Sequence, residues 1–169
     1  MTLLEHAEAA AARLPIGARR RVFQVGYVAL QGWWLIRRPH TSGVKVVLRR
    51  GDDVLLVRHT YGRRSEWDLP GGFLNESEDP QDAALREISE ELGVQARRPV
   101  ALGAILVRSM GRRDTRHGFA ADADPDSAEL DVDAGEIAQA RWFAHDALPP
   151  ATSDYTRRMV ARAFWDTFR

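Results

Sequence analysis

Residues 79–93 constrain the fold of this chain more than any other segment, because they predict a helix with defined ends and two different faces. Asp79 is a favourable N-cap, and Pro80 suits the first helical position, where its missing N–H costs nothing. Gly93 provides a C-terminal stop. Between these ends, apolar residues recur at helical spacing and predict a buried stripe: Ala84, Leu85, Ile88 and Leu92.

The opposite face of this helix is acidic. At about 100° per residue, Glu87, Glu90 and Glu91 fall within roughly a third of a turn of one another. Three carboxylates so close repel one another unless a positive charge lies between them. Clustered carboxylate oxygens suit Mg²⁺ or Mn²⁺. Arg86 precedes Glu90 by one turn, so we expect it to hold that carboxylate in position.

The helix belongs to a longer pattern with fixed spacing. Gly72 is followed six residues later by Glu78, and the pattern continues through the helix to Gly93 and Val94. The whole run reads G-x5-E-x7-R-E-U-x-E-E-x-G-U, where U is a bulky aliphatic residue. This is the Nudix box, and the chain resembles the Nudix hydrolase superfamily. The alternative, a merely solvated charged helix face, explains neither Gly72 nor Glu78.

The resemblance implies a set of site residues. It implies that a divalent ion, Mg²⁺ or Mn²⁺, is held by the Gly71 carbonyl together with Glu87, Glu90 and Glu91, and that Gly72, Glu78 and Arg86 support the site. The turn before the box, Trp67 to Gly72, is similar to the W-x-L-P-G-G approach of the family. Two positions depart from the family pattern: Asn75 replaces a frequent Glu, and Ser77 replaces a frequent Gly.

A fourth acid lies further along the chain. Glu136 precedes Ala140-Arg141-Trp142-Phe143, and many family members carry a Glu before a similar R-W-F strand. The resemblance therefore makes Glu87 and Glu136 the two candidates for the catalytic base. A solvated turn remains the alternative for Glu136. For phosphate recognition, we expect the loop 108–117 to supply Arg112, Arg113 and Arg116, although a solvated hairpin tip would have the same composition.

Strand patterns surround the box. Gly43–Leu48 and Val54–Val57 flank a turn at 50–53 and predict a hairpin. Further strands are expected at 100–107, 118–121, 129–132 and 138–143, with a closing amphipathic helix at 152–168. Hairpins predict a mixed sheet rather than a parallel one. These elements match the Nudix α/β/α sandwich that the resemblance implies, with an N-terminal helical extension at 1–40 and the Nudix domain at 41–169.

The N-terminal forty residues stand apart. A first helix is expected at 3–14, followed by a helix at Val22–Ile36, which has no charged residue in its 15 positions. Such a helix would be roughly 22 Å long, short of the roughly 30 Å hydrocarbon core of a bilayer, so we do not expect it to span a membrane. Packing on the Nudix core, homodimer contact, or peripheral membrane contact through residues 19–38 would each cover its apolar surface.

Composition limits the partners of the chain. Its 169 residues have 44% hydrophobic and 28% charged content, which is ordinary for a single soluble domain. Lys and Arg number 24, as do Asp and Glu, so the formal charge is zero and no nucleic-acid partner is expected. Absence of Cys excludes a thiol nucleophile and agrees with the expected cytoplasmic location.

The resemblance implies metal-dependent hydrolysis of a pyrophosphate bond in a small phosphorylated substrate. The expected substrate is a nucleoside diphosphate linked to another group, and nucleotide sugars, dinucleotides and nucleoside triphosphates all remain open. A non-catalytic nucleotide-binding or regulatory module on the same fold is the alternative. Loss of a box Glu would favour that alternative, and none is lost in this chain.

Overall fold

Three helices and one five-stranded sheet make up the part of the chain that the computed structural model describes, residues 15–37, 39–62, 65–109, 112–125 and 130–165. The helix expected at 3–14 lies outside these residues. The helices are α2 (Ile16–Arg37), α3 (Pro80–Leu92) and α4 (Asp154–Trp165). The strands are β1 (His40–Arg50), β2 (Asp53–His59), β3 (Ala96–Ser109), β4 (Arg112–Ala123) and β5 (Ile137–Ala144).

The sheet is mixed, as the hairpin pattern predicts. Its strand order is β3-β4-β1-β2-β5, in which β1 and β4 run parallel and every other neighbouring pair runs antiparallel. The β1–β2 hairpin closes at the Arg50–Asp53 pair, inside the turn that the sequence predicts. In the parallel pair, Val44 of β1 is opposite His117 of β4.

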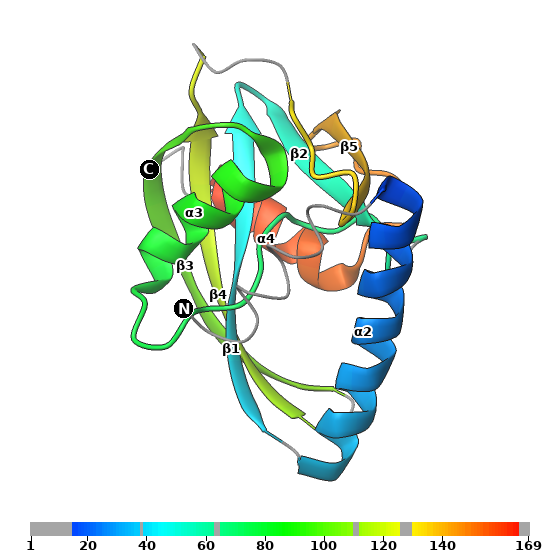
Figure 1. The fold of residues 1–169 in the computed structure, drawn as a ribbon. Coiled ribbons are helices and arrows are strands. Elements are labelled where there is room, and N and C mark those ends of the chain that lie inside the picture. Colours follow the sequence, from blue (N-terminus) through cyan, green and yellow to red (C-terminus); the bar gives the residue numbers. More distant parts are fainter. Residues whose placement is uncertain (1–14, 38, 63–64, 110–111, 126–129, 166–169) are drawn as a thin grey trace.

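One helix covers each face of the sheet, which gives the predicted three-layer sandwich (Figure 1). Helix α3 buries Ala84, Ile88 and Leu92 against one face, and Ala83 joins them where the predicted stripe had Leu85. Helix α4 buries its apolar residues against the other face: Met159, Val160, Ala163 and Phe164. Full burial of a side chain such as Ile88 contributes about 2 kcal/mol, so this packing fixes the position of α3 and its acidic face.

Two local predictions were wrong. No strand forms at 130–132, where the backbone instead binds the end of α3: Asp131 N–H donates to Leu92 O at 2.9 Å, and Asp133 N–H donates to Glu91 O at 3.0 Å. These bonds satisfy helix carbonyls that have no partner within the helix. The expected loop 108–117 is mostly strand, because β3 and β4 continue to pair as far as Ser109 and Arg112.

Helix α2 is longer than the predicted Val22–Ile36 segment and packs on the domain with one face only. In Figure 1 it stands beside the sheet, with its last turn next to the start of β1. Trp34 is buried, whereas Val25 and Ile36 on the outer face are 69% and 82% exposed. None of the described helices combines the length and the apolar character needed to cross a bilayer.

Candidate active site

The helix that carries the acidic face begins and ends where the sequence predicts. The Asp79 side chain accepts a hydrogen bond of 2.8 Å from Gln81 N–H, and Pro80 occupies the first turn. Gly93 adopts the left-handed conformation at φ 65°, and its N–H donates to Ser89 O. These caps fix both ends of α3 and therefore the positions of the glutamates that the helix carries.

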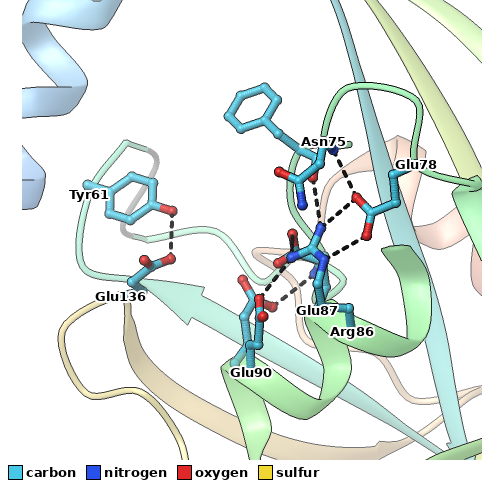
Figure 2. A network of polar contacts seen from close by, with 10 residues as sticks. Tyr61, Asn75, Glu78, Arg86, Glu87, Glu90 and Glu136 are labelled. Carbon is cyan, nitrogen blue, oxygen red and sulfur yellow. Dashed lines mark hydrogen bonds and ion pairs between the residues drawn. The ribbon is translucent and has the colours of Figure 1, made fainter. Parts of the chain in front are cut away.

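Arg86 is the centre of a network of acids (Figure 2). Its guanidinium binds both carboxylate oxygens of Glu78, at 2.8 and 3.0 Å. The Nη1 atom donates to Glu87 Oε1 at 2.9 Å and to Glu90 Oε2 at 2.8 Å. Glu78 also accepts the Asn75 N–H at 2.8 Å. Arg86 therefore joins the loop after the box's first Gly to two of the helix glutamates, with the planar, multiple donors that only an arginine offers.

Gly71 and Gly72, at the start of the box, lie against Glu91 and Glu87. Gly71 N–H donates to Glu91 Oε2 at 2.9 Å, and the Glu91 residue is only 6% exposed. Gly71 has φ 130°, and a Cβ there would lie 2.3 Å from Val44 O. At Gly72 a Cβ would lie 2.5 Å from Glu87 Oε1. Backbone and carboxylates thus approach so closely that neither position has room for a side chain.

Burial raises the pKa of two of the helix carboxylates. Burial raises the pKa of Glu91 to about 8, Lys45 opposes the rise, and the neighbouring charge of Glu87 adds to it. Burial also raises the pKa of Glu87, although Arg86 works in the opposite direction. A buried acid whose neighbours are acidic prefers the neutral form unless a cation is close. The site therefore has the electrostatic character of a cation-binding position.

The loop between Gly72 and α3 tolerates the departures from the family pattern. Ser77 adopts φ 63°, the left-handed region that favours glycine, at the position where many family members have Gly. The turn is closed by a backbone bond from Glu78 N–H to Asn75 O at 3.2 Å. A non-glycine residue in this region costs about 1 kcal/mol, and the loop still presents Glu78 to Arg86.

The charge of Glu136 acts on Glu91 of the helix, and Tyr61, a residue that sequence reasoning missed, contacts Glu136. Tyr61 Oη donates to Glu136 Oε2 at 3.4 Å (Figure 2). Burial raises the pKa of the Tyr61 hydroxyl, and the charges of Glu136, Glu91 and Glu87 raise it further. These four side chains therefore share one electrostatic environment. The available signal was an aromatic residue just past the end of the second strand, before Gly62.

Of the three arginines expected to bind phosphate, Arg116 points away from the carboxylates. Arg116 Nε donates to the buried Asp114 at 2.9 Å, and its guanidinium lies 5.6 Å from the ring centre of Tyr155 on α4. Arg116 is thus on the face of the sheet opposite α3. Arg113 is exposed on β4, and the side chain of Arg112 lies outside the described residues.

The carboxylate and carbonyl oxygens of the site are suitable ligands for a hard divalent cation, although the side chains do not converge on a single position. Within the described ranges, no three His, Cys, Asp or Glu side chains are close enough to hold an ion as they stand. In this arrangement the carboxylates of Glu87 and Glu90 are hydrogen-bonded to Arg86. Carboxylate and carbonyl oxygens are the ligands that Mg²⁺ and Mn²⁺ prefer, and burial raises the pKa of Glu91 and Glu87, so a cation beside them would stabilise their charged forms.

The NUDIX domain family matches residues 39–163, about three quarters of the chain. This protein belongs to the NUDIX family. The family match begins at the start of β1, so α2 lies outside it. A solved NUDIX relative, the MutT NUDIX hydrolase from Burkholderia pseudomallei, has a TM-score of 0.66 and 27% identity, and the alignment covers 73% of this chain and 97% of that one.

Two curated relatives carry the name NAD-capped RNA hydrolase NudC. The protein from Vibrio parahaemolyticus serotype O3:K6 (strain RIMD 2210633) is 30% identical over 122 residues, which are 70% of this chain and 43% of the relative. The one from Shigella dysenteriae serotype 1 (strain Sd197) is 28% identical over 124 residues, 68% of this chain and 44% of the relative. The chain therefore spans less than half the length of these relatives. All three similar proteins are named as hydrolases, in agreement with the predicted enzyme class.

Proposed function

We propose that this protein hydrolyses a pyrophosphate bond in a nucleoside diphosphate linked to another group, with Mg²⁺ or Mn²⁺ as cofactor. The observation that carries the proposal is the complete acidic set of α3, held against the glycine turn. Glu91 is fixed by Gly71, and Glu87 lies against Gly72. A protein that only binds nucleotides has no need of so costly an arrangement of buried acids.

The residues divide the work between metal binding and proton transfer. Glu87, Glu90, Glu91 and the Gly71 carbonyl would hold the ion. Such an ion would supply positive charge opposite the phosphates and would lower the pKa of a bound water molecule. Glu136, or alternatively Glu87, accepts a proton from the attacking water at a carboxylate oxygen. Arg86 keeps Glu78 and the helix glutamates in register.

We propose that the substrate is a small molecule that contains a pyrophosphate bond. The NudC relatives are named for NAD-capped RNA, but the neutral formal charge of this chain gives no general attraction to an RNA backbone. We therefore place nucleotide sugars, dinucleotides and nucleoside triphosphates ahead of capped RNA. Arg113 is exposed on β4 and is the arginine of the predicted set that we propose for phosphate contact.

The proposal is tested by a substrate panel. The full chain is incubated with Mg²⁺ or Mn²⁺ and with representatives of the three small-molecule classes and an NAD-capped oligoribonucleotide. The phosphorylated products of pyrophosphate hydrolysis are then separated and quantified. We expect turnover of at least one small pyrophosphate, abolished by EDTA and restored by added metal. Tight nucleotide binding by calorimetry without turnover of any compound would instead identify a binding module.

A further inference from the structure

Helix α2 is attached to two loops that lie beside the candidate active site. Arg19 forms an ion pair with Asp133, and Arg20 Nε donates to Ala134 O at 3.0 Å. Gln24 Nε2 donates to Thr60 O at 3.3 Å. Arg19 and Arg20 lie on one turn of α2, and Gln24 lies on the next turn. Their contacts end on only two short segments, the end of β2 and the loop before β5.

Helix α2 approaches both segments so closely that a side chain at either loop glycine would require its neighbour on α2 to shift. A Cβ at Gly135 would lie 2.7 Å from Arg19 Nε. A Cβ at Gly62, which has φ 64°, would lie 3.3 Å from the Tyr27 hydroxyl oxygen. Each loop therefore has a glycine at the point where α2 comes nearest.

Aromatic contacts add to the polar ones. The Tyr61 ring stacks on Phe23 with centroids 6.3 Å apart, and its centroid lies 5.3 Å from that of Tyr27. Such ring pairs contribute about 1 kcal/mol each beyond the area they bury. The ring of Tyr61 is thus held by α2, while its hydroxyl contacts Glu136.

Thr60 joins the two loops through hydrogen bonds. Thr60 N–H donates to Glu136 O at 2.7 Å, and Thr60 Oγ1 donates to Gly135 O at 2.6 Å. Thr60 is only 5% exposed, so water does not compete with these bonds. Whatever fixes Thr60, Tyr61 and Asp133 therefore also fixes the backbone and the carboxylate of Glu136.

We propose that α2 is a positioning element of the active site, which holds Tyr61 and residues 133–136 so that the Glu136 carboxylate is oriented toward the acids of α3. The inference rests on the proposed function, and it assigns a catalytic task to a helix outside the family match. Glu136, the proposed base, lies in the loop before β5. Without α2, this loop and the segment after β2 would be held mainly by those two strands. Precise placement of a base within hydrogen-bonding reach is what general base catalysis requires.

The first experiment compares arginines on neighbouring positions of α2. In Arg19→Ala/Arg20→Ala we expect kcat to fall about 10-fold, with KM within twofold of wild type, because only the orientation of Glu136 changes. The matched control is Arg21→Ala, since Arg21 is exposed on the outer side of the same turn. Two single variants at position 19 are also compared. Arg19→Lys keeps the positive charge opposite Asp133, so its kcat should be close to that of the wild type, whereas the kcat of Arg19→Ala should be lower.

A double-mutant cycle separates positioning from general destabilisation. Tyr61→Phe keeps the ring contacts with α2 and removes only the hydroxyl, so we expect a fall in kcat of about fivefold. In a Glu136→Gln background, neither Tyr61→Phe nor Arg19→Ala/Arg20→Ala should lower kcat further, because both act through Glu136. Fully additive losses in that background would overturn the proposal.

Amide hydrogen exchange gives a readout that does not depend on activity. Loss of the α2 contacts should raise exchange at residues 60–62 and 133–137 by about 10-fold, while Arg21→Ala leaves it unchanged. Equal exchange and equal kcat in the two arginine variants would show that α2 only covers the domain. If the wild-type chain turns over none of the pyrophosphates, the proposed function fails, and unchanged exchange in the loop would separately refute the role of α2.

Discussion

Glu91, on the last turn of α3, accepts a hydrogen bond of 2.9 Å from the backbone N–H of Gly71, 20 residues earlier in the chain. This bond ties the acidic helix to the glycine turn that enters the box. Burial raises the pKa of Glu91 to about 8, and the Gly71 N–H opposes this rise because it stabilises the charged carboxylate. The contact therefore fixes the position of a buried carboxylate whose charged form a cation would stabilise further.

Removal of single carboxylates tests the assignment of the metal ligands. Glu90→Gln and Glu91→Gln should each lower kcat by about 10²-fold, because each removes a charge at the reacting centre. Glu76→Gln is the matched control, since Glu76 is exposed in the loop before α3. Steady-state kinetics with circular dichroism checks the expectation. Wild-type turnover in either box variant, or full activity after exhaustive chelation, would refute the metal site.

Substitution of the first glycine tests whether the close approach of the backbone is required. Gly71→Ala forces an unfavourable φ and a clash with Val44 O, so we expect a loss of about 3 kcal/mol in the free energy of unfolding. Gly26→Ala, in α2, meets no atom within 4 Å and should stabilise the protein by up to about 1 kcal/mol. Urea denaturation measures both. Equal stability of the two variants would contradict the geometry of the turn.

Two arginines of β4 are expected to behave differently. Arg116→Ala leaves the buried Asp114 carboxylate without its ion pair, so stability should fall by about 2 kcal/mol while KM is unchanged. Arg113→Ala should leave stability unchanged and raise KM severalfold if Arg113 binds substrate phosphate. The pair is compared by thermal denaturation and steady-state kinetics. A raised KM in Arg116→Ala alone would place the opposite face of the sheet in the substrate site.

The buried imidazole of His59 should make the free energy of unfolding depend on pH. Burial lowers its pKa from 6.5 to about 4, with a further contribution from Lys45. Between these values the unfolded chain binds more protons than the folded one, so this contribution is complete above pH 6.5 and is lost as the pH falls toward 4. The loss between pH 7 and pH 5 should be about 2 kcal/mol. Denaturant titrations at both values should show it in the wild type and not in His59→Gln, and an equal loss in both would contradict the prediction.

The sequence alone determined what depends on local spacing. The ends of α3, its buried stripe and the three glutamates on its other face follow from residues 79–93, because caps and helical periodicity act within one or two turns. The mixed sheet follows from hairpin signals in the same way. Ser77 shows that a single local departure from the family pattern is absorbed by the backbone, at φ 63°.

Only the tertiary structure decided which distant groups meet. Tyr61 reaches Glu136 across 75 positions of the chain, and Asp133 meets Arg19 across 114. The segment 130–132 does not form the predicted strand, and the backbone N–H groups of Asp131 and Asp133 instead donate to carbonyls at the end of α3. Arg116 faces α4 because side chains alternate along β4. Such pairings depend on how the layers stack, and the packing free energy that fixes this stacking is spread over the whole core rather than held in any short motif.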